Sequence, residues 1–179
     1  MVYVLLGAGF EETEAITPVD LLRRANIPVQ TVGLNGKTVY GSHRIGIEAD
    51  ITVEEMDLTT LEMLVLPGGL GGVASIRSCE SAMAAIRFAH ENEKWVAAIC
   101  AAPTILAKLD MLTDKTAVCY PGCEEEMPGV AIADKAAVRD GNIITGTSAG
   151  CAVAFGLALI EALKGSKEAT RIAQQIVIR

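Results

Sequence analysis

The chain has 179 residues, 51% of them hydrophobic, and carries 15 basic against 22 acidic side chains, for a net charge of −7. This length predicts one ordinary domain, and the acidic balance argues against nucleic acid and anionic membranes as partners. The mean hydropathy is +0.38, yet no apolar run approaches the ~20 residues that a membrane-spanning helix needs. No basic segment precedes the first apolar stretch, so the expected compartment is the cytoplasm.

Apolar runs of strand length alternate along the chain with segments of helix length. Runs rich in Val, Ile and Leu predict strands at Tyr3–Leu6, Val29–Gly33, Met63–Leu66, Val96–Ile99, Thr116–Cys119 and Asn142–Thr145. Helices are predicted at Glu12–Ala25, Ser78–Asn92, Ala101–Leu109, Ala152–Leu163 and Lys167–Gln174. Because the strands are apolar on both faces, they favour a parallel sheet that helices cover on both sides.

Two hairpins interrupt this alternation. The first joins Lys37–Tyr40 to Arg44–Glu48, and the second joins Ala136–Arg139 to Asn142–Thr145 through the turn Asp140-Gly141. No repeat, linker or low-complexity tract divides the chain. The sequence therefore predicts a single α/β domain over residues 1–179, a three-layer sandwich with a mostly parallel central sheet and an appended hairpin.

Three segments follow predicted parallel strands at the edge where such sheets bind ligands. They are Gly7–Glu14, Pro67–Gly72 and Cys100–Pro103. Ligands bind beyond the carboxyl ends of parallel strands because helix N-termini and free backbone N–H groups converge there. We therefore expect the functional residues in these three segments.

Cys100 is the strongest candidate for a reactive side chain. It follows an apolar strand and precedes a helix with Pro103 in an early turn, so it is predicted to lie on a sharp strand-to-helix turn. There the helix dipole and free N–H groups would stabilise a thiolate, lower its pKa and make the sulfur a nucleophile or an oxidation target. An inert buried cysteine is equally consistent with the spacing.

Glu14 and the pair Gly68-Gly69 are the candidate partners of this sulfur. Glu14 is predicted to face the sheet, where two neighbouring anions would share a proton and the carboxyl group would act as general acid and base. The glycines would leave backbone N–H groups facing an oxyanion or a sulfinate, unless they form only a turn. For Glu11 and Glu12, stabilisation of the helix dipole is a sufficient explanation.

Metal, cofactor and histidine chemistry have little support in the sequence. His43 and His90 are not placed to act as the base of a cysteine–histidine pair, and Cys119-x-x-x-Cys123 lacks the second ligand pair of a zinc site. Gly7-Ala8-Gly9 lacks the third glycine of a dinucleotide loop. We therefore expect no metal and no cofactor. Because the five cysteines are odd in number, reduced thiols are expected.

Four collinear motifs span essentially the whole chain: GFEETE at 9–14, PVDLLRRA at 18–25, LVLPGG at 64–69 and AAICAAP at 97–103. Together they resemble the ThiJ/PfpI superfamily, in the branch of the Parkinson-associated protein deglycases and their bacterial relatives. The resemblance implies a flavodoxin-like fold in which Cys100 is the reactive cysteine and Glu14 its acid partner. It also implies an anion hole formed by the N–H groups of Gly69 and Ala101.

The same resemblance implies a homodimer that acts on a small aldehyde or glycated substrate without a cofactor. Members of this branch pair through the first helix and the hairpin, where Arg24 and Arg44 match arginines near the contact. Reported activities of the branch include conversion of 2-oxoaldehydes to 2-hydroxy acids, deglycation of aldehyde-damaged amino groups, and redox-dependent protection or chaperoning.

Differences from the sequence patterns of the wider superfamily limit the activities expected of this chain. Tyr120 stands where catalytic relatives often carry His, and a phenol is a poorer acid–base group at neutral pH than an imidazole. Ala101 replaces the His of protease-like members, and no later His serves as in glutamine amidotransferases, so neither activity is expected. Three hypotheses stay open: an aldehyde-converting enzyme, an oxidative-stress sensor in which Cys100 becomes a sulfinate, and a scaffold with an inert thiol.

Overall fold

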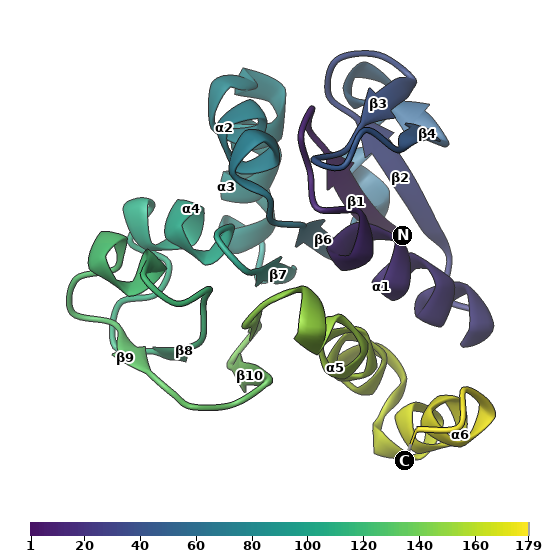
Figure 1. Cartoon of the computed structure of the whole chain (residues 1–179), viewed down its shortest axis with the longest axis vertical. Helices are drawn as coiled ribbons and strands as arrows, with labels where there is room; N and C mark the ends of the chain where they lie inside the picture. Colours follow the sequence, from purple (N-terminus) through teal and green to yellow (C-terminus); the bar gives the residue numbers. More distant parts are fainter. Residues whose placement is uncertain (179) are drawn as a thin grey trace.

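A seven-stranded sheet forms the centre of the structure, a computed structural model that describes residues 1–178 (Figure 1). The strand order is β10-β11-β7-β6-β1-β2-β5. These strands are β1 (Val2–Leu6), β2 (Val29–Gly33), β5 (Ile51–Thr52), β6 (Met63–Leu66), β7 (Trp95–Ile99), β10 (Ala137–Asp140) and β11 (Ile143–Gly146). Neighbouring strands are parallel except β10 and β11, which form an antiparallel hairpin.

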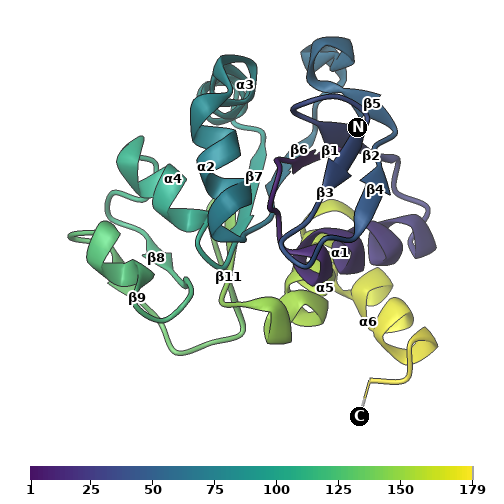
Figure 2. The same cartoon turned by 45° about the horizontal axis from the view of Figure 1, so that its top comes forward.

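Helices cover both faces of this sheet (Figure 2). One face carries α1 (Glu12–Arg24), α5 (Ala152–Lys164) and α6 (Ser166–Gln175), and the other carries α2 (Leu70–Ser78), α3 (Glu80–Glu91) and α4 (Pro103–Lys108). The predicted three-layer α/β sandwich is thereby confirmed. No helix within residues 1–178 has both the length and the apolar composition needed to cross a lipid bilayer.

Alternate residues of the central strands enter two separate cores. Val2, Val4 and Leu6 of β1 belong to the core beneath α1 and α5, whereas Tyr3 and Leu5 belong to the core beneath α3 and α4. Successive side chains of a strand point to opposite faces, so a strand that is apolar throughout needs helices on both sides. This is why the unbroken apolar runs in the sequence predict the layered architecture.

Both predicted hairpins are present. β3 (Thr38–Tyr40) and β4 (Gly46–Glu48) form a two-stranded sheet of their own. β10 and β11 are joined by a turn at Gly141, whose φ of +61° favours glycine because it has no Cβ. The first hairpin lies against the start of α1, where it borders the site described below.

The prediction that 116–119 is a strand of the central sheet is wrong. β8 covers only Thr116–Ala117 and pairs with β9 (Ala131–Ile132) in a separate two-stranded sheet. β11 already pairs with β7 on one side and with β10 on the other, so 116–119 cannot pair with β11. The chain instead passes β11, where the Val118 N–H donates to the Thr145 hydroxyl, and continues toward the end of β7.

Helix α2 begins inside the segment 67–72, where the sequence predicts no helix. Glycine has low helix propensity, but Gly72 lets the helix lie close to the chain after β1, since a Cβ on Gly72 would lie 2.7 Å from the Phe10 Cα. Packing thus overrides local propensity. α3 and α4 are shorter than predicted, whereas α1, α5 and α6 match their predicted ranges to within one residue at each end.

Candidate active site

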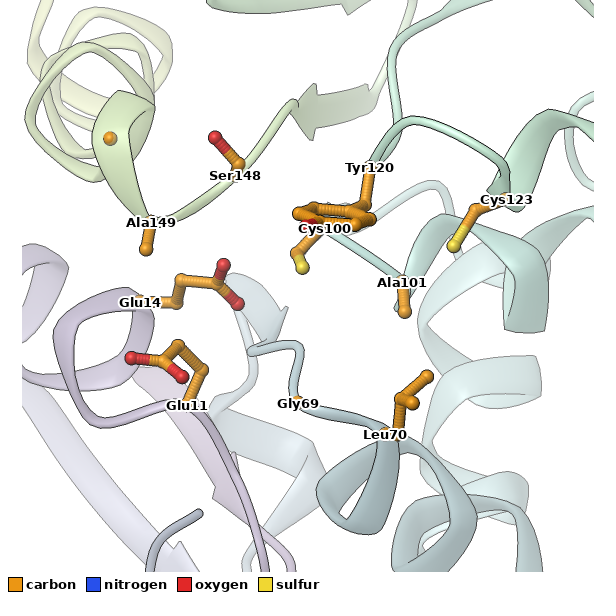
Figure 3. A pocket seen from close by; sticks show the side chains of 11 residues that line it. Glu11, Glu14, Gly69, Leu70, Cys100, Ala101, Tyr120, Cys123, Ser148 and Ala149 are labelled. Atoms are coloured by element: carbon orange, nitrogen blue, oxygen red, sulfur yellow. The ribbon is translucent and has the colours of Figure 1, made fainter. Parts of the chain in front are cut away.

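The carboxyl ends of β1, β6 and β7 border a cavity of about 450 Å³ (Figure 3). This is the sheet edge where the sequence predicts the functional residues. All four residues predicted for the site, Glu14, Gly69, Cys100 and Ala101, line this cavity. They come from α1, the turn before α2 and the turn before α4, so the parallel topology brings together segments that are far apart in the sequence.

Cys100 lies on the predicted sharp turn between β7 and α4. Its backbone φ is +67°, a left-handed conformation that costs a residue with a Cβ ~1–2 kcal/mol. Two hydrogen bonds hold it there: the Cys100 N–H donates to the Gly146 carbonyl (2.9 Å), and the Cys100 carbonyl accepts from the Tyr120 N–H (2.8 Å). The sulfur is directed into the cavity beyond the end of the strand (Figure 3).

Glu14 reaches the same sulfur from α1. It is only 1% exposed, its carboxyl group accepts a 2.9 Å hydrogen bond from the Gly68 N–H, and it lies against the Cys100 thiol, which acts on its pKa. Only glycine fits at position 68, because a Cβ there would lie 2.6 Å from the Cys100 Cβ. Burial raises the pKa of Glu14 to about 7, although the hydrogen bonds with Cys100 and Gly68 oppose the rise.

The prediction that the thiol has a lowered pKa is wrong. Burial raises the pKa of the Cys100 thiol to about 12, and the charge and hydrogen bond of Glu14 add to the rise, while hydrogen bonds from the N–H groups of Gly69 and Ala101 oppose it. α4 begins only at Pro103 and is six residues long. Desolvation and a buried anionic neighbour therefore outweigh the dipole of a short helix.

Above the pKa of Glu14, about 7, Glu14 and Cys100 hold one proton between them. Both pKa values are raised, so a second negative charge in the pair is strongly disfavoured. The proton resides either on the sulfur, leaving a carboxylate, or on the carboxyl group, leaving a thiolate. In the second arrangement the thiolate receives hydrogen bonds from Glu14, Gly69 and Ala101. The pair can therefore supply a nucleophile and a proton carrier at the same place.

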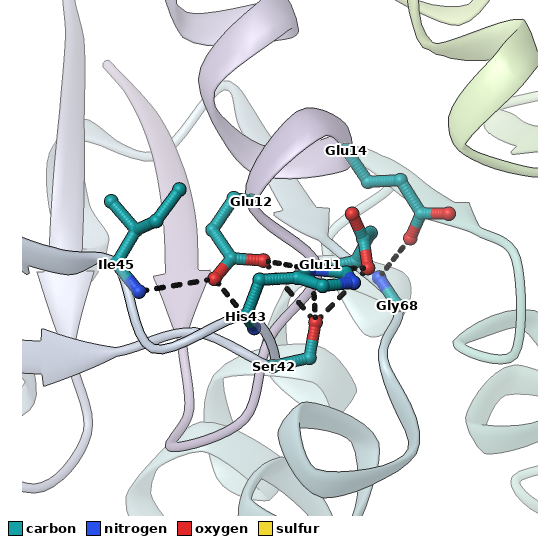
Figure 4. A network of polar contacts seen from close by, with 7 residues as sticks. All are labelled: Glu11, Glu12, Glu14, Ser42, His43, Ile45 and Gly68. Carbon is teal, nitrogen blue, oxygen red and sulfur yellow. Dashed lines mark hydrogen bonds and ion pairs between the residues drawn. The ribbon is translucent and has the colours of Figure 1, made fainter.

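A polar network joins the start of α1 to the loop of the β3–β4 hairpin (Figure 4). The Glu12 carboxyl group, 8% exposed, accepts hydrogen bonds from the N–H groups of His43 (2.8 Å) and Ile45 (3.4 Å) and from the Ser42 hydroxyl (3.2 Å). Burial alone would raise the pKa of Glu12, but the hydrogen bonds together lower it to about 2. The hydrogen bond with Glu12 and the charges of Glu11 and Glu12 raise the pKa of His43.

The same network is the only group within residues 1–178 in which three potential metal-ligating atoms, from Glu11, Glu12 and His43, lie within 4.8 Å of one another. These side chains are already engaged: the Ser42 hydroxyl donates to Glu11 (3.0 Å), and His43 Nδ1 lies 3.0 Å from Glu12 Oε2. The network attaches the hairpin to α1. Glu12 therefore has a structural role in addition to stabilising the helix dipole.

Comparisons with known proteins identify the family of this chain. A family model described as DJ-1/PfpI family matches residues 1–162 of the chain. The chain belongs to the DJ-1/PfpI family. Protein dj-1beta of Drosophila melanogaster is 34% identical to it over 178 residues, which cover 98% of this chain and 95% of that protein. The family resemblance stated from the four motifs is therefore confirmed.

Two further DJ-1/PfpI relatives bear on the chemistry of the family. A protein of Pyrococcus horikoshii that is named a deglycase is 30% identical over 146 residues, covering 80% of this chain and 87% of that protein. The structure of oxidised Toxoplasma gondii DJ-1 superposes with a TM-score of 0.94 at 28% identity, covering 98% of this chain and 97% of that one. Family members thus include a protein named for deglycation and one captured in an oxidised state.

The DJ-1/PfpI cavity of this chain also contains residues that the sequence did not predict there. They are Leu70 (81% exposed), Tyr120 (51% exposed), Cys123 and residues 148–150, which follow the end of β11. The last segment could have been found, because it follows a predicted parallel strand. The position of Cys123 in the cavity could not have been predicted, because it depends on 119–123 folding back to Cys100. The other cysteines and both histidines do not line the cavity.

Proposed function

We propose that this protein converts small 2-oxoaldehydes to 2-hydroxy acids without a cofactor, with Cys100 as the nucleophile and Glu14 as the general acid and base. The observation that carries the proposal is that the buried Glu14 carboxyl group lies against the Cys100 thiol and that both line the cavity. Covalent catalysis by cysteine needs a thiolate and a proton carrier within hydrogen-bond reach. The relative named a deglycase supports an aldehyde or glycated molecule as the substrate class.

The proposed reaction needs no reactant other than the 2-oxoaldehyde and water. The Cys100 sulfur adds to the aldehyde carbon and forms a hemithioacetal, while the N–H groups of Gly69 and Ala101 stabilise the developing negative charge. Glu14 takes the proton from the former aldehyde carbon and returns it to the adjacent carbonyl carbon, which yields a thioester of the 2-hydroxy acid. Water hydrolyses the thioester and restores the thiol, so one 2-oxoaldehyde and one water give one 2-hydroxy acid.

Turnover of methylglyoxal by the purified protein tests these roles. Cys100→Ser and Glu14→Gln are each expected to lower kcat/KM by about 10²-fold or more, because each removes one of the two reacting groups. Cys79→Ser is the matched control, since this thiol lies outside the cavity, and it is expected to retain the wild-type rate. An unchanged rate in Cys100→Ser or Glu14→Gln rejects the proposed roles.

One observation favours a second function, a sensor or protective protein in which Cys100 is oxidised to a sulfinate. Tyr120 lies beside Cys100 in the cavity (Figure 3), and a phenol transfers protons less readily at neutral pH than an imidazole. Glu14 and the N–H groups of Gly69 and Ala101 would donate hydrogen bonds to a sulfinate at this position. The oxidised relative from Toxoplasma gondii supports the same chemistry.

Mass spectrometry after treatment with excess peroxide tests the second function. Cys100 is expected to gain two oxygens before the other four thiols react, because its sulfur lies in the cavity with the N–H groups of Gly69 and Ala101 against it. Even modification of all five cysteines contradicts a sensor at Cys100.

We also propose that the protein is a homodimer formed through α1 and the β3–β4 hairpin. Both elements expose apolar side chains: Ile16 is 37%, Tyr40 62% and Ile45 54% exposed. Light scattering is expected to give twice the chain mass of 18.8 kDa. Ile45→Asp should shift the protein to the monomer, whereas Ile132→Asp, on the distant strand β9, should not. A monomeric mass for the wild-type protein contradicts the proposal.

A further inference from the structure

The cavity contains a second thiol besides that of Cys100. Cys100 and Cys123 both line it and are both half-buried, whereas Cys119 is buried in the core. Figure 3 shows both sulfurs on the cavity side of their backbones, with the ring of Tyr120 above Cys100. Ala101, which lies near both sulfurs in this view, carries only a methyl group. A second nucleophilic group, with no role in the aldehyde reaction, therefore faces the same space as the reactive cysteine.

The backbone ties the turn that carries Cys123 to Cys100. The Tyr120 N–H donates to the Cys100 carbonyl (2.8 Å), and the Cys123 N–H donates to the Tyr120 carbonyl (2.9 Å). Cys123 is thus one turn away from Tyr120, whose backbone is hydrogen-bonded to that of Cys100. A disulfide needs Cα atoms within ~4.4–6.8 Å of each other, and any movement needed to close a bond between the two sulfurs falls on this one turn.

The turn has room to make that movement. Residues 120–122 are exposed, and Gly122, with a φ of +93°, has no atom within 4 Å of the place where a Cβ would stand. The 3-10 helix that follows (Cys123–Glu126) is held at its far end by Glu126, which pairs with Lys108 (2.7 Å) and Arg77 (3.3 Å). The segment is therefore anchored at both ends, and Cys123 stays at the cavity wall while the turn between the anchors adjusts.

We propose that Cys123 is a resolving thiol, which forms a disulfide with Cys100 after a peroxide has oxidised Cys100. The proposal rests on the reactivity of Cys100 proposed above, but it does not require turnover of an aldehyde. It assigns a function to a residue of the cavity that neither proposed activity uses.

The two steps balance with hydrogen peroxide as the oxidant. The Cys100 thiolate attacks one peroxide oxygen, the O–O bond breaks, and hydroxide leaves with the proton of the Glu14 carboxyl group as water, so that Cys100 becomes a sulfenic acid. The Cys123 sulfur then attacks the sulfenic sulfur and the S–O bond breaks. The departing hydroxide takes the proton of Cys123 and leaves as a second water. Two thiols and one peroxide thus give one disulfide and two waters.

Disulfide formation competes with the second oxidation of Cys100. A sulfenic acid that meets another peroxide becomes a sulfinate, which thiols do not reduce, whereas a disulfide is returned to two thiols by exchange. Cys123 therefore protects the reactive cysteine at low peroxide, and the sulfinate forms when peroxide is in excess or when Cys123 is absent.

Peptide mapping of the whole protein after one equivalent of hydrogen peroxide tests the proposal. Under non-reducing conditions, the tryptic fragments Trp95–Lys108 and Thr116–Lys135 are expected to be joined, with the loss of two hydrogens. The second fragment holds both Cys119 and Cys123, so alanine variants of the two are compared. The link is expected to persist in Cys119→Ala and to be lost in Cys123→Ala, where the sulfinate at Cys100 should increase about tenfold.

The outcomes separate this inference from the proposed function. Conversion of wild-type Cys100 to a sulfinate while Cys123 stays reduced overturns the resolving role and leaves the reactivity of Cys100 intact. A link that persists in Cys123→Ala also overturns it. If Cys79 and Cys151 are oxidised while Cys100 is not, both proposals fail. The mapping of the wild-type protein does not depend on the folding of any variant.

Discussion

At the scale of the residue, Glu14 is a buried carboxyl group whose ionisation opposes folding. Burial raises its pKa from 4.5 to about 7, so the folded protein binds this proton more tightly than the unfolded chain does. The stabilisation is complete below the unfolded pKa and is lost as the pH rises through the folded pKa. A shift of this size corresponds to ~3 kcal/mol.

Glu14→Gln is expected to remove this pH dependence. Glutamine still offers an oxygen to the Gly68 N–H but does not ionise, so the variant should exceed the wild-type free energy of unfolding by up to ~3 kcal/mol at pH ~8 and differ little at pH ~4. Urea unfolding at the two pH values measures the difference. Glu91→Gln, on the exposed face of α3, controls for the loss of one charge. A more stable wild-type protein at the higher pH contradicts the raised pKa of Glu14.

The shared proton also predicts how Cys100 reacts with an alkylating agent. The pair loses its first proton near the pKa of Glu14, about 7, so labelling by iodoacetamide should rise through that pH and then level off. In Glu14→Gln the neighbouring charge is absent, so the pKa of the thiol should fall below its wild-type value of about 12. Labelling rates across pH ~5–10, read by mass spectrometry, compare the two proteins. Identical profiles contradict a shared proton.

At the scale of the elements, Glu12 joins α1 to the β3–β4 hairpin. Glu12→Ala leaves the N–H groups of His43 and Ile45 without this acceptor and is expected to lower the free energy of unfolding by ~2 kcal/mol at neutral pH. The pKa of Glu12 is lowered to about 2, so its stabilisation is present above pH 4.5 and is lost as the pH falls through about 2. The sign is therefore opposite to that of Glu14, two residues further along the helix.

Thermal unfolding at several pH values measures the contribution of Glu12. The difference between the wild-type protein and Glu12→Ala should shrink as the pH falls. Glu48→Ala, at an exposed position of β4 in the same hairpin, is the matched control and is expected to change stability by no more than ~0.5 kcal/mol. A deficit in Glu12→Ala that is no larger than in Glu48→Ala contradicts the proposed attachment.

At the scale of the whole molecule, one sheet separates two cores. Each central strand contributes side chains to both, so neither core can persist when the strands separate. We therefore propose that the chain unfolds as one domain. Trp95, the only tryptophan, lies in β7 with the Arg139 guanidinium 4.6 Å from the centre of its ring, and its fluorescence should change together with far-UV circular dichroism. Separate transitions contradict a single domain.

The sequence by itself determined the layered fold and the place of the site. Unbroken apolar runs require helices on both faces of a sheet, and parallel strands bring their carboxyl ends to one edge, so Cys100, Glu14 and Gly69 could be assigned to one site from local pattern and resemblance. Both depend on properties that a short stretch of sequence carries: apolar periodicity, turn residues and position after a strand.

Only the tertiary structure decided how the groups of that site ionise and that Cys123 lines the same cavity. Glu14 and Gly68 lie 54 positions apart and meet only in the folded chain, and the burial that raises both pKa values arises from the same packing. The path of 116–123 likewise depends on its hydrogen bonds with Thr145 of β11 and with Cys100. Desolvation, charge proximity and long-range hydrogen bonds depend on distances between remote segments, which no local pattern contains.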